Sequence, residues 1–263
     1  LEIEAWTEFA ISLFIIVSRI ISRLKTGGTK SFHGDDYLSA VVLILWTSQL
    51  VIFKYVGKHV LGTNIGLSDS ERASMGEQEM SRRIIGSKIL IFGWALYATL
   101  IWILKACMLF FYNRLTLGLT EQKLVRITAI LCGCTYLAVL LTLLLYCHPL
   151  RLHWQVYPDP GPKCTVDYVN YLVVAVLNVI TDAIILAIPI PLLVKVRLPL
   201  RRKLTIGLLL CGGLFVMAAT LLRCLLVVKD AENIEVANIW GIRETFVAIL
   251  AVNIPCIKSI VNA

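Results

Sequence analysis

Long apolar runs, separated by short polar segments, follow one another along most of the chain. Each run has about the 20 residues that an α-helix needs to cross the ~30 Å hydrocarbon core of a bilayer. The pattern predicts an all-α membrane protein, a single domain over residues 1–263 that forms a seven-transmembrane helix bundle. The expected spans are about 5–22, 37–56, 86–111, 124–146, 168–194, 204–228 and 239–260.

The composition supports a membrane protein and argues against separate soluble domains. Hydrophobic residues make up 58% of the chain and charged residues 16%, against about 45–50% and about 25% in soluble domains. No polar stretch is long enough to bury a core of its own. The net charge of +8 comes with no basic patch interleaved with aromatic residues. We therefore expect basic loops that contact anionic membrane lipids, and no nucleic-acid partner.

Lysine and arginine near the span ends predict the orientation of the bundle, because loops rich in these residues stay in the cytoplasm. Thirteen of them follow or end the odd-numbered spans, and eight follow the even-numbered spans. The N-terminus is therefore expected outside and the C-terminus in the cytoplasm. Segment 195–203, KVRLPLRRK, contributes most to this difference. Since the first residue is Leu1, we expect a chain that is trimmed at its start.

Asp182 lies within the almost wholly apolar stretch NVITDAIILAIPIPLL, residues 178–193. It is about 14 residues into the fifth span, which at 1.5 Å per residue places it near the middle of the bilayer. A charge there costs at least ~2.5 kcal/mol, so the side chain should face the bundle interior and have a partner. Asn178 lies one turn earlier on the same face. Pro189 and Pro191 predict a helix end or kink below them.

Other polar residues fall at matching depths in the outer half of the bundle. Arg223 and Glu244 each lie about five residues from the outer end of their spans, where an ion pair would offset part of their desolvation. Gln49, Trp94 and Tyr97 reach a similar depth. These groups either hold the helices in register or form a ligand pocket that opens to the outside. We favour the pocket, since intramembrane charges usually serve a function.

Lys105 lies in the inner third of the third span, and we expect its amine to extend toward the cytoplasmic face. A salt bridge from Lys105 to Asp182 is a weaker expectation than contacts of Asp182 with Asn178 or Arg223. A retinal protein needs a Schiff-base lysine inside the bundle, usually on the last span. The seventh span has only Lys258, at its cytoplasmic end, so we expect no retinal and no other cofactor.

Cys147 and Cys164 both fall in the second outer loop, residues 147–167. The outside is oxidising, so a disulfide between them is permitted. His148 and His153 lie between the two cysteines and raise the alternative of a zinc site. Their spacing matches no common zinc pattern, so we favour the disulfide.

Asp35 and Asp36 precede the second span in the sequence FHGDDYL. Two carboxylates can bind Mg²⁺ with a diphosphate, but no DDxxD motif and no second acidic motif follows. A helix N-terminus offers unpaired amides and the positive end of its dipole, so we interpret the pair as a helix cap and expect no metal site. The sequence has no Ser/His/Asp set and no Gly-rich phosphate loop, so no catalytic residue is assigned.

An ordered set of short motifs runs along nearly the whole chain. They are R-x3-R at Arg19 and Arg23, GDD at 34–36, GKH at 57–59, K-x5-FYNR at 105–114, C-x-P-x4-W-x9-C at 147–164, N-x2-TD-x6-P-x-P at 178–191, Arg223, W-x3-E at 240–244, and IP at 254–255. This set resembles the fungal rhodopsin-like integral membrane family, which includes satratoxin-cluster membrane proteins and pathogenicity receptor-like proteins. The resemblance implies a filamentous fungus, a seven-helix bundle and no retinal. Some members are treated as receptors coupled to G proteins, and others belong to secondary-metabolite clusters.

Three functions follow as expectations. The first is a receptor-like protein, more often in the plasma membrane than in an internal membrane, that senses a small lipophilic ligand and signals to a cytoplasmic partner. The alternative is a membrane enzyme of secondary metabolism with Asp182 or Glu244 as acid or base. The third is a transporter that uses the same charges as a proton relay. Against the receptor, FYNR stands in place of a DRY motif, and NIPCI in place of NPxxY.

Overall fold

The computed structural model describes residues 2–27, 32–59, 62–117, 121–191, 200–229 and 234–261. Every element found in these residues is helical. The long helices are α1 (Glu2–Gly27), α2 (Gly34–His59), α4 (Glu77–Leu115), α5 (Glu121–Leu145), α7 (Tyr168–Ala187), α9 (Leu200–Lys229) and α10 (Ile234–Val261). The short ones are α3 (Asp69–Ser74), η2 (Leu150–Trp154) and α6 (Pro162–Thr165). The predicted all-α class is confirmed.

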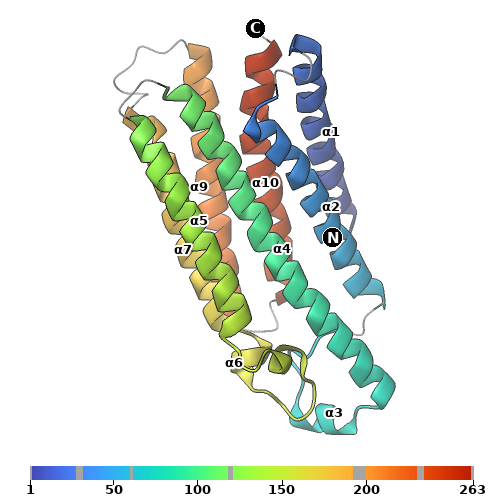
Figure 1. Ribbon diagram of the computed structural model, residues 1–263. Helices are drawn as coiled ribbons and strands as arrows, with labels where there is room; N and C mark the ends of the chain where they lie inside the picture. The colour runs from blue at the N-terminus through green and yellow to red at the C-terminus, as the bar shows by residue number, and fades with distance from the viewer. Residues whose placement is uncertain are drawn as a thin grey trace.

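The long helices lie side by side in one bundle, in which the chain runs up and down (Figure 1). Helices that follow one another along the chain pack together, and α10 returns to pack against α1, so the neighbours close a ring. Helix α4 also contacts α7 and α10 across the bundle. The short helices α3, η2 and α6 gather at one end of the bundle, which we call the loop end. The chain finishes at the opposite end.

Six of these helices are long and apolar enough to cross a membrane, within the part of the chain that the structure describes. They correspond to the first six predicted spans. The seventh long helix, α10, covers the last predicted span, but its side chains from residue 254 onward lie outside the described residues, as does that of Lys258. Residues 192–199, which include the start of the basic segment KVRLPLRRK, also lie outside them.

Large apolar side chains project from the outside of the bundle. Phe14 is 73% exposed, Ile130 69% and Phe92 59%. Soluble monomers rarely expose large contiguous apolar patches. In a hydrocarbon environment, exposure of apolar side chains costs no free energy. Helices also satisfy their backbone hydrogen bonds internally, as the bilayer core requires. The outer surface is therefore that of a membrane-embedded bundle.

Helix α4 differs most from its predicted span, which was 86–111. It has 39 residues, about 58 Å at 1.5 Å per residue, nearly twice the thickness of the hydrocarbon core. Its first turns carry the polar sequence EQEMSRR and continue the helix beyond the apolar segment. The preceding helix α3 begins with a capping box, in which the Ser68 hydroxyl accepts from Glu71 N and the Glu71 carboxylate accepts from Ser68 N. The segment between the second and third predicted spans thus contains α3 and the first turns of α4.

The predicted break near the end of the fifth span is found. Helix α7 ends at Ala187, and the Ile188 amide donates to the Ile185 carbonyl at 3.3 Å. Pro189 has no amide hydrogen to continue the α-helical pattern to that carbonyl. The chain is helical again from residue 189 to residue 191. The helix is therefore interrupted about two turns beyond Asp182, where the prolines begin.

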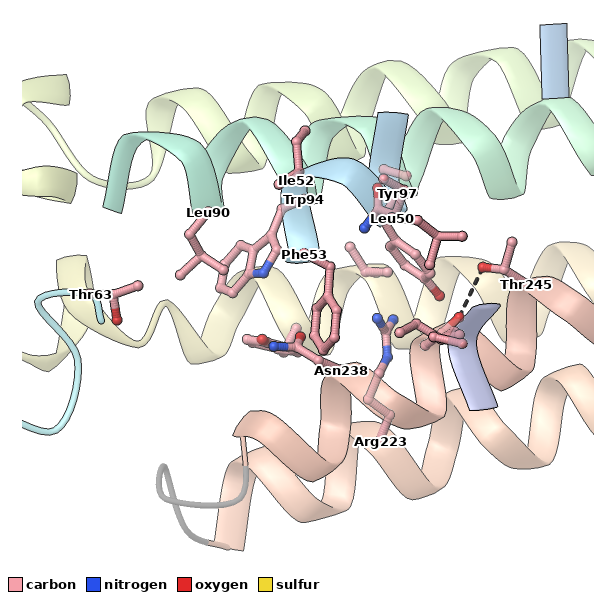
Figure 2. Close-up of a pocket in the computed structure, with 18 of the residues that line it drawn as sticks. Leu50, Ile52, Phe53, Thr63, Leu90, Trp94, Tyr97, Arg223, Asn238 and Thr245 are labelled. Atoms are coloured by element: carbon pink, nitrogen blue, oxygen red, sulfur yellow. Dashed lines mark hydrogen bonds between the residues drawn. The ribbon is translucent and has the colours of Figure 1, made fainter. Parts of the chain in front are cut away.

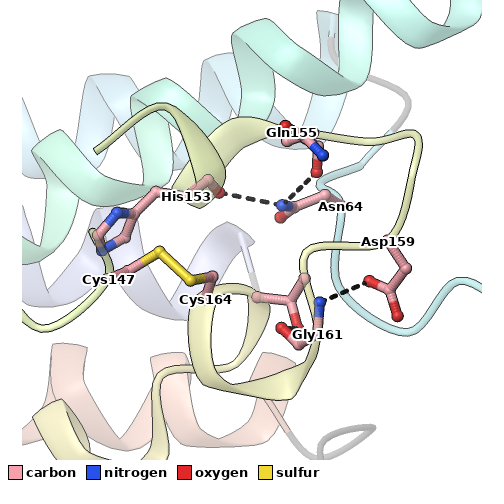
Figure 3. The surroundings of a disulfide bond; sticks show 8 residues. Asn64, Cys147, His153, Gln155, Asp159, Gly161 and Cys164 are labelled. Atoms are coloured by element: carbon pink, nitrogen blue, oxygen red, sulfur yellow. Dashed lines mark hydrogen bonds between the residues drawn. A yellow bond between two sulfur atoms is a disulfide. The ribbon is translucent and has the colours of Figure 1, made fainter. Parts of the chain in front are cut away.

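A disulfide joins Cys147 and Cys164 at the loop end (Figure 3), as predicted. Both sulfurs are consumed by this bond, so neither cysteine is a zinc ligand. The Asn64 amide donates to the carbonyls of His153 and Gln155 at 3.0 Å each, which ties the segment before α3 to the segment around η2. The His153 ring is buried, and this burial lowers its pKa, so the imidazole is held neutral.

Asp167, the N-cap of α7, also lies at the loop end and should make stability depend on pH. Its backbone has φ 52°, its carboxylate accepts from the Asn170 amide at 3.2 Å, and burial raises its pKa to about 6. The folded pKa lies above the ordinary value of 3.8, so the folded state binds the proton more tightly than the unfolded state does. The contribution of Asp167 to stability is therefore fully present below about pH 4 and is lost as the pH rises through about 6, by up to about 3 kcal/mol.

The matched variant is Asp167→Asn, because asparagine tolerates a positive φ and still accepts a hydrogen bond from the Asn170 amide. Thermal unfolding between pH 4 and pH 7 should show a decreasing midpoint in the wild type and a flatter profile in the variant. Equal slopes in the two proteins would show that Asp167 is not the titrating group.

Asp35 and Asp36 lie in the first turn of α2, and Asp36 accepts from the backbone amide of His33 at 3.0 Å, as expected of a cap. Their main partner, however, is Arg19 of α1, which is fully buried. The Arg19 guanidinium donates to Asp35 at 2.6 Å, to Asp36 at 2.9 Å and to Asn253 of α10 at 3.0 Å. The interpretation of Asp35 and Asp36 as a helix cap was therefore incomplete. The sequence does not show that the packing of α1 against α2 brings Arg19 next to these carboxylates.

Candidate functional site

A cavity of about 590 Å³ lies inside the bundle and reaches to its loop end. Four residues between α2 and α3 line it on the loop-end side, and residues from all the long helices line the rest; the four are Gly62, Thr63, Ile65 and Gly66. Its walls are rich in aromatic side chains, and Figure 2 shows Phe53 of α2 and Trp94 and Tyr97 of α4 around it. A volume of roughly 300–1,000 Å³ with mainly apolar walls is typical of small-molecule sites.

The structure divides the predicted polar residues into two groups. Four of them line the cavity: Gln49, Trp94, Tyr97 and Arg223. The other three do not line it and form a buried cluster beside it: Asn178, Asp182 and Glu244. The outer-half polar layer expected from the sequence is therefore partly a cavity wall and partly a helix-packing network.

Arg223 of α9 is the residue that joins the two groups. Figure 2 shows its guanidinium directed into the cavity, with its carbon 4.3 Å from the centre of the Tyr97 ring. Its Nε lies 4.0 Å from Glu244 Oε2 of α10, at the outer limit of an ion pair. The expected pairing of Arg223 with Glu244 is thus present but loose. The two terminal nitrogens of Arg223 make no hydrogen bond with any residue that the structure describes.

Glu244 is completely buried and anchored by two other helices. Its Oε1 accepts from the Thr220 hydroxyl of α9 at 2.6 Å and from the Asn178 amide of α7 at 3.2 Å. The Asn178 amide also donates to Thr220 at 2.7 Å. Sequence reasoning missed Thr220, although its position three residues before Arg223 places both on one face of α9.

Asp182 pairs with Lys105 of α4 rather than with Asn178 or Arg223. The Lys105 amine contacts the Asp182 carboxylate and donates to the Asn178 carbonyl at 3.2 Å, and both charged side chains are nearly buried. The ranking of Asp182 partners made from the sequence is therefore wrong. Side chains on a helix tilt toward its N-terminus, and α4 starts at the loop end. The Lys105 side chain thus extends toward the loop end and Asp182, and not toward the opposite end of the bundle.

Together these contacts form one polar network across four helices. It begins at the cavity with Arg223, continues through Glu244 and Asn178, and ends at the pair of Asp182 and Lys105. Each ion pair is neutral as a unit, which is how charges survive in the membrane interior. One oxygen of Asp182 and one of Glu244 have no hydrogen-bond donor among the described residues. Neither carboxylate lines the cavity, so a bound molecule would meet Arg223 and Tyr97 first.

Comparisons with known sequences agree with this architecture. Residues 18–263 match the family model of the fungal rhodopsin domain. We found no match among curated proteins or among solved structures. The match extends from within α1 to the end of the chain and includes every residue of the polar network. The protein is an integral, multi-pass membrane protein, and the chain belongs to the fungal rhodopsin domain family.

Proposed function

We propose that this protein is a seven-helix, receptor-like membrane protein that binds a small lipophilic ligand in the 590 Å³ cavity, without retinal. The observation that supports this proposal most strongly is the position of the cavity in the bundle. It reaches the loop end, has aromatic walls, and has Arg223 as its connection to the polar network. In this proposal α10 is the seventh span, and the receptor lies in the plasma membrane.

The disulfide supports an orientation with the loop end outside. Disulfides persist in oxidising compartments and are rare in the cytosol. The bond between Cys147 and Cys164 therefore favours an extracellular loop end and a cytoplasmic opposite end. This agrees with the excess of basic residues expected at the opposite end. A ligand would then enter from outside, and a signalling partner would contact the cytoplasmic segments.

Ligand binding would act through Glu244. A molecule that binds the terminal nitrogens of Arg223 would weaken its loose pairing with Glu244, and Glu244 is hydrogen-bonded to α7 and α9. A shift of Glu244 therefore changes the contacts between three helices, one of which carries Asp182. A ligand shifts a conformational equilibrium only by its difference in affinity for the two states. The loose Arg223–Glu244 pair is where such a difference arises.

The alternative, a membrane enzyme acting on a lipophilic substrate, rests on Glu244 as acid or base. The observation in its favour is the second carboxylate oxygen of Glu244, which has no donor among the described residues and lies next to Arg223. Against it, Glu244 and Asp182 do not line the cavity. The receptor interpretation needs no such access and is therefore preferred.

Filling the cavity tests the proposal. Gly93 of α4 lines it, and a Cβ added there would lie 3.7 Å from Ile52, an ordinary contact. Gly93→Leu should fill part of the cavity and leave the fold intact, because leucine favours a helix by about 0.8–1 kcal/mol over glycine. Gly207→Leu on α9 is the matched control, since nothing lies within 4 Å of its added Cβ.

The measurement is mass spectrometry of small molecules that co-purify with each protein from fungal membranes. We expect a specific lipophilic molecule with the wild type and with Gly207→Leu, and its loss from Gly93→Leu. The same molecules on all three proteins would refute ligand binding in this cavity. A chemical change of the bound molecule during incubation would favour the enzyme over the receptor.

A further inference from the structure

We propose that the ligand of this cavity is a lipophilic carboxylic acid whose anionic group binds Arg223 and whose apolar body lies between the aromatic walls. This inference rests on the proposed ligand-binding function and goes further by naming the chemical class of the ligand. It is carried by three features of the cavity, which are the charges of its lining, the unused donors of Arg223 and the placement of Glu244.

All the charged side chains that line the cavity in the described part of the chain are basic. Three basic residues, Lys54, Arg83 and Arg223, line the cavity, and none of its described lining residues is Asp or Glu. Arg83 is paired with Glu79 at 3.0 Å. The Lys54 amine lies 5.2 Å from the centre of the Trp6 ring and has no carboxylate partner in the described part of the chain. An anion that enters this space is attracted by these side chains, whereas a cation is repelled.

Arg223 has unused hydrogen-bonding capacity where it faces the cavity. A guanidinium offers five N–H donors, and its two terminal nitrogens form a fork that matches a carboxylate in a bidentate arrangement. In this structure only Nε approaches an acid, at 4.0 Å from Glu244. The fork has no acceptor among the described residues. The nearby Tyr97 hydroxyl is also buried, but the Glu244 carboxylate already attracts it, so the fork of Arg223 is the main donor to an anion.

Glu244 is held in a position where it cannot serve as the full partner of Arg223. Its Oε1 is occupied by Thr220 and Asn178, which holds the carboxylate outside the cavity lining. Closer approach of Arg223 would require these hydrogen bonds to break. The fork therefore stays directed into the cavity, and a ligand acid supplies the acceptors that it lacks.

The rest of the cavity suits an apolar, unsaturated body. The side chains of Trp46, Phe53, Trp94 and Tyr171 contribute aromatic faces or edges to its walls. Trp94 and Tyr171 already meet edge to face, with ring centres 4.7 Å apart. Such walls favour offset or edge contacts with another ring system.

Binding of three matched fluorescent probes tests the inference. The probes are 1-pyrenebutyric acid, 1-pyrenebutanol and 1-pyrenebutylamine, which share one skeleton and differ in the head group. Quenching of tryptophan fluorescence reports binding, because Trp46 and Trp94 line the cavity. The signal obtained with Gly93→Leu is subtracted, since it measures partition of the probe into detergent micelles. A hydrogen bond to a charged group is worth about 1.4 kcal/mol more than a neutral one, which corresponds to about tenfold in affinity.

We expect the wild type to bind the acid at least about tenfold more tightly than the alcohol, and the amine most weakly. Arg223→Gln combined with Glu244→Gln removes both charges, so it avoids an unpaired buried carboxylate, and it should bind the acid and the alcohol equally. Arg223→Lys should retain only part of the preference, because lysine lacks the fork.

Equal affinity of the wild type for acid and alcohol, or an acid preference that survives in the double variant, would overturn the inference. Displacement of the acid probe by phosphatidic acid but not by oleic acid would also overturn it, since the site would then recognise a lipid phosphate. Whether the cavity binds lipophilic molecules at all is decided separately by the co-purification comparison with Gly93→Leu. Failure of the acid assignment and failure of the proposed function are thus distinguishable.

Discussion

Replacing Lys105 with methionine should destabilise the protein by about 3–5 kcal/mol, as expected when one partner of a buried ion pair is removed. Lys105 and Asp182 are 3% and 10% exposed as side chains. Without the amine, the Asp182 carboxylate must stay buried without its counter-charge or take up a proton on folding. The Asn178 carbonyl also loses the hydrogen bond from the amine.

The second substitution, Asp182→Asn, separates the charge effect from the packing effect. In the double variant Lys105→Met/Asp182→Asn no buried charge remains, so we expect recovery of most of the lost stability. Lys88→Met is the matched control, because Lys88 is exposed and should change stability by less than about 1 kcal/mol. Reaction of the buried Cys107 and Cys132 thiols with a fluorescent dye during heating reports unfolding. A double variant no more stable than Lys105→Met would show that the two residues do not act as a pair.

This pair also bears on the proposed function. If the polar network transmits ligand binding, its inner end at Asp182 and Lys105 should respond to the outer end at Arg223. The double variant that restores stability should then still bind the ligand but respond to it differently. Binding and response are separate readouts, because neither Lys105 nor Asp182 lines the cavity.

The sequence predicted the elements of this protein better than their contacts. Long apolar runs are sufficient to locate membrane helices, because the bilayer imposes both length and hydrophobicity. Asp182 and Glu244 could be recognised as important for the same reason, since ionisable groups inside such runs need partners. The disulfide also followed from the loop in which its two cysteines lie.

What the sequence could not supply is the rotation of each helix about its axis. The partner of Asp182 was ranked by depth along the spans, and depth alone does not tell which residues face each other. The cavity was expected from its polar residues, but its division into lining residues and a packed network depends on those rotations. Arg19 appeared in the sequence only as part of the motif R-x3-R, whereas packing of α1 against α2 and α10 makes it the centre of a cluster.

That cluster gives the second large effect, because Arg19 connects three helices near the proposed cytoplasmic end. Arg19→Met should cost about 3–5 kcal/mol, since it removes the guanidinium that binds Asp35 and Asp36 and leaves their buried carboxylates under-compensated. Arg23 still reaches Asp36 at 3.3 Å, so some compensation remains. Asn253 of α10 loses the donor that holds it to α1.

The matched control is Arg243→Met, which breaks the pair of Arg243 with Glu4. This pair has a distance of 2.7 Å, similar to that of Arg19 with Asp35, but its side chains are 37% and 41% exposed. Exposed pairs contribute about 0–1 kcal/mol, so the two arginine variants should differ severalfold in their effect. The triple variant Arg19→Met/Asp35→Asn/Asp36→Asn should regain stability beyond Arg19→Met, because it removes the charges together. An equal loss of stability in Arg19→Met and Arg243→Met would contradict the prediction. It would mean that the buried Arg19 cluster stabilises the contacts of α1, α2 and α10 no more than an exposed ion pair does.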